Sequence, residues 1–190
     1  MIKATCAVLA NREIENEIAR LAWDVHRRFS TGLLARRIPP HVSLKQPFPM
    51  ENDLSRFEDY VKGLAQQTDP FHIELDGFFT WPGVFGISVR ESPTLRSLHN
   101  LLNTDLPNLF GDAKADFDGD SYSFHVTVAT GGASEATYAE IGNAYAGVEF
   151  QRSFEARELA IFAYDLPSDG ESDFLMHTVL PLGVVAKNRV

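Results

Sequence analysis

Two four-residue segments of the chain combine residue types that can transfer protons. Residues 41–44 read HVSL and residues 125–128 read HVTV, so each segment has a histidine followed two positions later by a hydroxyl residue. Imidazole has an unperturbed pKa of about 6.5 and exchanges protons near neutral pH. Hydrolysis of a phosphodiester needs a base that takes a proton from water and an acid that protonates the leaving oxygen. His41 and His125 could divide these roles if both faced one phosphorus atom.

Both segments lie in predicted β-strands, over residues 41–46 and 123–129. Side chains alternate between the two faces of a strand, so each histidine shares a face with its hydroxyl residue, and the apolar residues anchor the other face in the core. Cα atoms two positions apart in a strand are separated by roughly 6.5–7 Å. An imidazole and a hydroxyl at this spacing can reach different oxygens of one bound phosphate.

Three further residues are expected to bind the substrate. The hydroxyl groups of Ser43 and Thr127 can donate hydrogen bonds to non-bridging phosphate oxygens, where negative charge must be stabilised. Lys45 continues the alternation of the first strand, so we expect it on the face of His41, where it adds a positive charge.

A metal-dependent hydrolase is a less favoured interpretation of the two histidines. Catalytic metal sites need about three clustered histidine, cysteine or carboxylate ligands, and neither segment has a second ligand beside its histidine. Asp116, Asp118 and Asp120 imitate part of a calcium-binding loop, but the remaining ligands of such a loop are missing. We therefore expect no metal and no other cofactor.

The longer sequence around each histidine resembles the 2H phosphoesterase superfamily, which includes the bacterial 2′-5′ RNA ligase group and cyclic nucleotide phosphodiesterases. Residues 40–48 (PHVSLKQPF) are similar to the first motif of that family and residues 124–128 (FHVTV) to the second. The resemblance implies a bilobal, pseudo-twofold pair of antiparallel sheets with outer helices and a central cleft between His41 and His125. It also implies metal-independent hydrolysis, or reversible formation, of a 2′,3′-cyclic or 2′,5′ phosphodiester in a nucleotide or at an RNA end.

Two alternative functions use the same residues. The cleft could hold a nucleotide or an RNA end for regulation without turnover, although binding alone does not need two proton carriers. The chain could also be a structural protein in which the two histidine strands are unrelated. The arrangement of the two imidazoles in space distinguishes this last interpretation from the others.

Composition limits the partners of the protein. The chain has 190 residues, of which 44% are hydrophobic, enough for a sizeable core. A net charge of −9 argues against binding a long nucleic acid but permits a small phosphorylated substrate. The chain has no run of about 18 consecutive apolar residues, so we expect no membrane-spanning segment. The single cysteine, Cys6, permits no intramolecular disulfide, which favours a reducing cytoplasm.

The elements that must position the two segments alternate between strands and helices. Strands are predicted over residues 3–9, 41–46, 71–80, 84–90, 123–129, 149–154, 158–164 and 173–181, and helices over residues 11–30, 53–66, 93–109 and 134–146. Short hairpins interrupt the alternation, so an α+β fold with antiparallel sheets is favoured over a doubly wound parallel sheet. We expect one domain over residues 1–190.

Several other residues have two open interpretations. The turn at Trp81 could place an aromatic ring at the rim of the cleft, where it would stack on a base, or its aromatic residues could cover the core. Arg36 and Arg37 could contact a phosphate or be solvent-exposed, and Tyr122 could line the cleft.

The other four histidines, His26, His72, His99 and His177, lack a companion hydroxyl. We expect His26 and His99, which fall in helical patterns, at the surface or in packing, and His177 in a structural role.

Overall fold

The protein consists of two antiparallel sheets and four helices, as described by a computed structural model over residues 2–34, 37–50, 54–111, 113, 115–165 and 174–183. The first sheet contains β1 (Ile2–Leu9), β2 (His41–Ser43), β3 (Phe48–Met50), β8 (Glu158–Asp165) and β9 (Phe174–Pro181). Its order is β2-β1-β8-β9, and β3 also pairs with β1. The second sheet contains β4 (Phe71–Trp81), β5 (Val84–Val89), β6 (His125–Thr130) and β7 (Gln151–Ala156), in the order β6-β5-β4-β7. This arrangement confirms the predicted α+β class.

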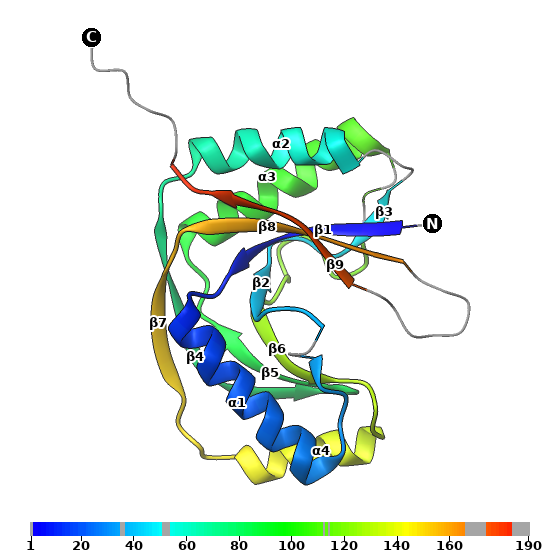
Figure 1. The fold of residues 1–190 in the computed structure, drawn as a ribbon, viewed down its shortest axis with the longest axis vertical. Helices are drawn as coiled ribbons and strands as arrows, with labels where there is room; N and C mark the ends of the chain where they lie inside the picture. Colours follow the sequence, from blue (N-terminus) through cyan, green and yellow to red (C-terminus); the bar gives the residue numbers. More distant parts are fainter. Residues whose placement is uncertain are drawn as a thin grey trace.

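The helices cover the two sheets in pairs. They are α1 (Arg12–Phe29), α2 (Leu54–Gln67), α3 (Pro93–Phe110) and α4 (Glu135–Tyr145). The helices α2 and α3 lie beside the first sheet, and α1 and α4 lie beside the second (Figure 1). Each sheet and its two helices form one lobe. The chain crosses between the lobes, because α1 follows β1 of the first sheet but contacts β6 of the second.

Local sequence explains why α1 forms and which face it buries. Asn11 accepts a hydrogen bond from the N–H of Ile14, which satisfies one of the open donors at the start of the helix. Ile14, Ile18, Ala22 and Val25 recur at helical spacing and are all buried. Acidic residues in the first turn and basic residues in the last complement the helix dipole.

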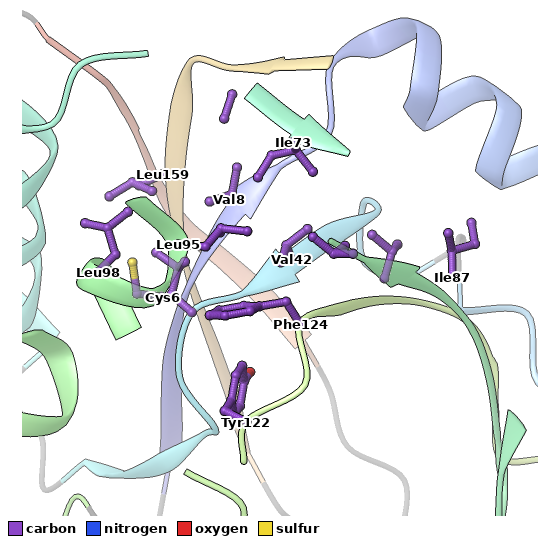
Figure 2. Packing of buried hydrophobic residues seen from close by; sticks show 14 of the residues in the cluster. Cys6, Val8, Val42, Ile73, Ile87, Leu95, Leu98, Tyr122, Phe124 and Leu159 are labelled. Atoms are coloured by element: carbon purple, nitrogen blue, oxygen red, sulfur yellow. The ribbon is translucent and has the colours of Figure 1, made fainter. Parts of the chain in front are cut away.

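One apolar core connects the two lobes. Val8 and Val42 of the first sheet belong to the same buried cluster as Ile73 and Ile87 of the second. Figure 2 shows these side chains among the buried residues of that cluster, with Val42 between Val8 and Ile87. Because the lobes share this core, they cannot separate without exposing apolar surface to water.

The predicted strand over residues 41–46 is wrong beyond Ser43. The chain bends at residues 44–45, and the separate short strand β3 then pairs with the first half of β1. Pro47 lies between the two strands, and because proline has no N–H it cannot donate to a continuous ladder.

The described helices include none with the length and apolar character needed to cross a bilayer.

Candidate active site

The two histidine segments occupy neighbouring edges of the two sheets. β2 is an edge strand of the first sheet, in which His41 pairs with Leu9, and β6 is an edge strand of the second. The two strands contact each other although no ladder joins them, and Figure 1 shows them side by side at the centre of the molecule. Segments 84 positions apart are thus brought together where the lobes meet.

The two imidazoles are close enough to interact electrostatically. Burial is the main cause that lowers the pKa of His41 from its ordinary value of 6.5 to about 4; the contact with the carbonyl of Pro39 opposes this shift, and the nearby charge of His125 adds to it. Burial also lowers the pKa of His125. His41 and Thr127 line the same narrow crevice, so the histidine of one segment lies near the hydroxyl residue of the other.

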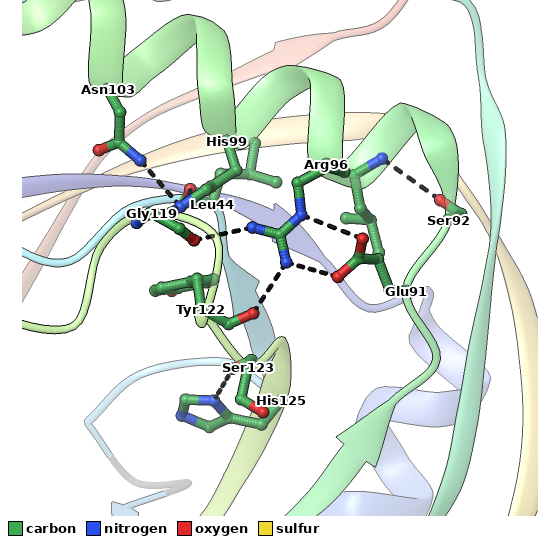
Figure 3. Close-up of polar contacts among 11 residues, drawn as sticks. Leu44, Glu91, Ser92, Arg96, His99, Asn103, Gly119, Tyr122, Ser123 and His125 are labelled. Atoms are coloured by element: carbon green, nitrogen blue, oxygen red, sulfur yellow. Dashed lines mark hydrogen bonds and ion pairs between the residues drawn. The ribbon is translucent and has the colours of Figure 1, made fainter.

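The two rings are held in the same way. The Nδ1 of His41 lies 2.9 Å from the carbonyl oxygen of Pro39. The Nδ1 of His125 lies 2.8 Å from the carbonyl oxygen of Ser123, a contact that Figure 3 shows. A carbonyl can only accept, so these contacts assign the proton of each neutral ring to Nδ1. The Nε2 atom of each ring then has a lone pair with which it can accept a proton.

The two predicted hydroxyl residues are half-buried beside their histidines. Ser43 pairs with Ala7 across the first sheet, and Thr127 pairs with Gly86 across the second. Within the part of the chain that the structure describes, neither hydroxyl has a hydrogen-bond partner. Both are therefore available to donate to a ligand.

Lys45 is placed differently from the expectation that it would share the face of His41. Its side chain is 1% exposed and its ammonium group forms an ion pair with Asp118, which also accepts the N–H of Gln46 at 3.1 Å. The physical reason is the bend after Ser43, because strand alternation does not continue to Lys45. Its charge is already neutralised by a buried carboxylate.

Aromatic side chains form a wall beside His125. The ring of Trp81 lies 5.0 Å from that of His125 and the ring of Phe79 lies 5.5 Å from it, both edge to face. The indole remains 43% exposed. The turn at Trp81 thus presents a ring to the site, whereas the neighbouring Phe78 packs into the core against Phe85.

A β-bulge determines which aromatic residues face the site. Simple alternation from the buried Leu75 would turn Phe79 and Trp81 toward the core. The register of β4 against β5 shifts between Leu75 and Phe78, and Gly77 adopts a φ of +76° within this irregularity. The extra residue reverses the alternation, so Phe78 takes the core face and Phe79 the opposite face.

Gly86 leaves room for the ring of Phe79. It pairs with Phe79 on one side and Thr127 on the other, and a Cβ atom added to it would lie 2.6 Å from two atoms of the Phe79 ring. The aromatic wall therefore depends on a glycine at this position.

We expect Gly86→Ala to displace Phe79 from His125. Overpacking of this kind costs about 1–3 kcal/mol of stability. The matched control is Gly63→Ala in α2, where an added Cβ meets nothing within 4 Å and alanine favours the helix. Chemical denaturation of both variants tests the prediction, which fails if Gly86→Ala is as stable as Gly63→Ala.

A hollow of about 530 Å³ opens between the turn at Trp81 and the segment that precedes β6. Its described lining residues are Gln46, Trp81, Pro82, Phe117, Ser121, Tyr122, Ser123 and His125. Tyr122 does line this space, as its position suggested. Ligand pockets for small molecules typically measure 300–1,000 Å³ and combine apolar walls with a few polar groups.

Other residues singled out in the sequence do not line this hollow within the described part of the chain. Arg36 falls outside the described residues, and Arg37 is exposed in the turn before β2. The Nε2 of His177 pairs with Glu58 at 2.9 Å and joins β9 to α2, as its predicted structural role requires. In the described part of the chain, no group of three or more histidine, cysteine or carboxylate side chains could hold a metal ion.

The chain belongs to the 2'-5' RNA ligase superfamily, because the sequence profile of that family matches residues 10–167. Two bacterial relatives carry the name "Putative phosphoesterase". The protein from Halalkalibacterium halodurans is 35% identical over 71 residues, which cover 35% of this chain and 42% of that relative. The protein from Oceanobacillus iheyensis is 25% identical over 131 residues, which cover 67% of this chain and 70% of that relative. The predicted membership of this family is thereby confirmed.

Solved structures share the fold over almost the whole chain. TT0787 of Thermus thermophilus has a TM-score of 0.67 at 17% identity, covering 95% of this chain and 98% of that one. LigT of E. coli in complex with 3'-AMP has a TM-score of 0.65 at 17% identity, covering 95% of this chain and 97% of LigT. At these identities the likeness concerns the fold.

Proposed function

We propose that this protein is a metal-independent phosphoesterase that hydrolyses a cyclic phosphodiester of a nucleotide or an RNA end. The observation that carries the proposal is the matched pair of imidazoles on adjacent edge strands, each with Nδ1 bonded to a carbonyl and Nε2 able to transfer a proton. The complex of LigT with 3'-AMP supports a nucleotide as ligand. A net charge of −9 and a hollow of about 530 Å³ favour a small substrate over a long nucleic acid.

His41 is assigned the role of general base and His125 that of general acid. The pKa of His41 is lowered to about 4, so as the pH rises His41 loses its proton before His125 does. A neutral imidazole is the form that can accept a proton from water. His125 lines the hollow that can accommodate the nucleoside, so it is placed to protonate the leaving ribose oxygen. The Nε2 of His41 takes a proton from water as the water oxygen bonds to phosphorus and the bond to the leaving oxygen breaks.

Ser43 and Thr127 are assigned to the non-bridging oxygens. Their hydroxyl groups have no other hydrogen-bond partner among the described residues, so they can donate to the phosphate as charge develops. Lys45 is proposed to contribute indirectly, because its ammonium group is paired with Asp118 inside the protein.

The experiment that tests this function is a substrate panel in the presence of a chelator. The panel contains 2′,3′-cyclic nucleotides, 2′,5′-linked oligonucleotides and RNA ending in a cyclic phosphate. The variant with both His41→Ala and His125→Ala serves as the blank. Turnover by the wild type alone supports the proposal. Binding without turnover would instead support a nucleotide-binding module.

The pH profile of the reaction follows from the two lowered pKa values. The base must be neutral, so kcat/KM should rise through the pKa of His41 near pH 4. The acid must be protonated, so kcat/KM should fall again as the pH passes the pKa of His125, which lies below 6.5. We expect a bell-shaped profile with its maximum between these values. An acid limb centred at pH 6.5 or above would contradict the assignment of His41 as the base.

A further inference from the structure

The segment where β2 ends is attached to other elements through its carbonyl groups. The carbonyl oxygen of Ser43 accepts the hydroxyl of Tyr122 at 3.0 Å, and that of Leu44 accepts Nδ1–H of His99 at 2.7 Å. Tyr122 lies three positions before His125, and His99 lies on α3. The end of the first motif is thus bonded both to the segment that precedes the second motif and to α3.

His99 is fully buried and both of its ring nitrogens are engaged. Its Nε2 accepts the main-chain N–H of Gly119 at 3.0 Å and lies 2.8 Å from the amide nitrogen of Asn103. Because Gly119 can only donate there, the proton of the neutral ring is on Nδ1, which bonds Leu44. His99 therefore bridges the first motif and the loop that leads to the second.

The same loop is also held to α3 by two hydrogen bonds from Arg96 (Figure 3) and by one stacking contact between rings. Arg96 donates to the carbonyl oxygens of Gly119 and Tyr122 at 2.9 and 3.1 Å. The ring of Tyr122 stacks on that of His99 at 4.2 Å. The loop that leads to His125 is therefore held against α3 by Arg96 and His99, and of these two side chains His99 is also bonded to the first motif.

We propose that His99 is a positioning residue that sets the separation between His41 and His125 by bonding at once to the first motif and to the loop that leads to the second. β2 and β6 belong to different sheets, so no ladder of main-chain hydrogen bonds determines how far apart the two rings lie. The bridge through His99 supplies that constraint. A misplacement of about 1 Å between reacting groups can cost roughly 100-fold in rate. The catalytic consequence of this inference depends on the proposed function, but the geometric consequence does not.

The test separates the two halves of the bridge. His99→Asn keeps a donor near the position of Nδ1 and loses the acceptor for Gly119, whereas His99→Gln keeps an acceptor near Nε2 and loses the donor to Leu44. His99→Phe removes both bonds and keeps a ring that can stack on Tyr122. The control is Tyr60→Phe in α2. This substitution removes the 2.8 Å hydrogen bond from Tyr60 to Asp105, which lies on α3 like His99 but belongs to neither motif.

For the cyclic phosphate that the wild type hydrolyses best, we expect His99→Phe to lower kcat by about 10–100-fold while KM changes by less than about threefold. His99→Asn and His99→Gln should fall between His99→Phe and the wild type, and Tyr60→Phe should keep the wild-type kcat. If His99→Phe does not fold, the Asn and Gln variants carry the same comparison. A kcat equal to that of Tyr60→Phe in all His99 variants that fold would overturn the inference.

A second readout needs no substrate. In an NMR titration of the imidazole protons, we expect the pKa of His41 to rise toward 6.5 in the His99 variants, because a wider gap admits water and weakens the influence of His125. It should stay unchanged in Tyr60→Phe. A shift in a protein without turnover would support the bridge and refute the proposed function. Turnover by the wild type, with no effect of the His99 variants on kcat or on the pKa of His41, would support the proposed function and refute the bridge.

Discussion

Replacing His125 or His41 by alanine is expected to lower kcat by about 10²–10⁴-fold, because each substitution removes one of the two proton transfers. The fold should survive, since both rings are only half-buried and each makes one hydrogen bond to a nearby carbonyl. His72→Ala is the matched control, because His72 is exposed on β4 and does not line the described hollow. Steady-state kinetics of the three variants would check the expectation.

Asparagine variants distinguish proton transfer from ring placement. In His41→Asn and His125→Asn the side-chain amide can still donate to the carbonyl of Pro39 or Ser123, but no group remains at the position of Nε2. We therefore expect them to be as inactive as the alanine variants. The double alanine variant should lose less than the product of the two single effects, because the histidines act in one step. Turnover above about one tenth of the wild type in either asparagine variant would refute the mechanism.

Asp118→Ala is expected to destabilise the fold by about 3–5 kcal/mol, because it leaves the charge of Lys45 buried without a partner. The two side chains are 1% and 9% exposed, so water cannot replace the lost carboxylate. Glu74→Ala is the control, since its ion pair with Arg90 is 54% and 60% exposed and should contribute less than about 1 kcal/mol. Urea denaturation measures both values.

Removing both members of the buried pair should be less harmful than removing one. In the variant Lys45→Met with Asp118→Leu, no buried charge remains, so a large part of the lost stability should return. This outcome would separate the cost of an unpaired charge from a general intolerance of substitution at Asp118. Equal stability of Asp118→Ala and Glu74→Ala would show that the pair carries no such penalty.

Local sequence patterns predicted the four helices, most of the strands and the placement of each histidine two positions before a hydroxyl residue, whereas β3 and the end of β2 at Ser43 were missed. The apolar stripe of α1 and the alternation of residues 125–128 are local patterns, and each requires only that a continuous segment bury one face. The two motifs were therefore recognisable without knowledge of any distant contact. The α+β class followed from the order of these local elements.

The tertiary structure decided which side chains the site presents. Lys45 is buried because Asp118, 73 positions later, neutralises it where the strand has ended. Trp81 and Phe79 face His125 because a bulge at Gly77 reverses the alternation, and a one-residue shift in pairing leaves no periodic signal. His99 was expected only at the surface or in packing, yet it bonds to Leu44 and Gly119. Such contacts depend on partners brought together by folding, and local patterns carry no information about them.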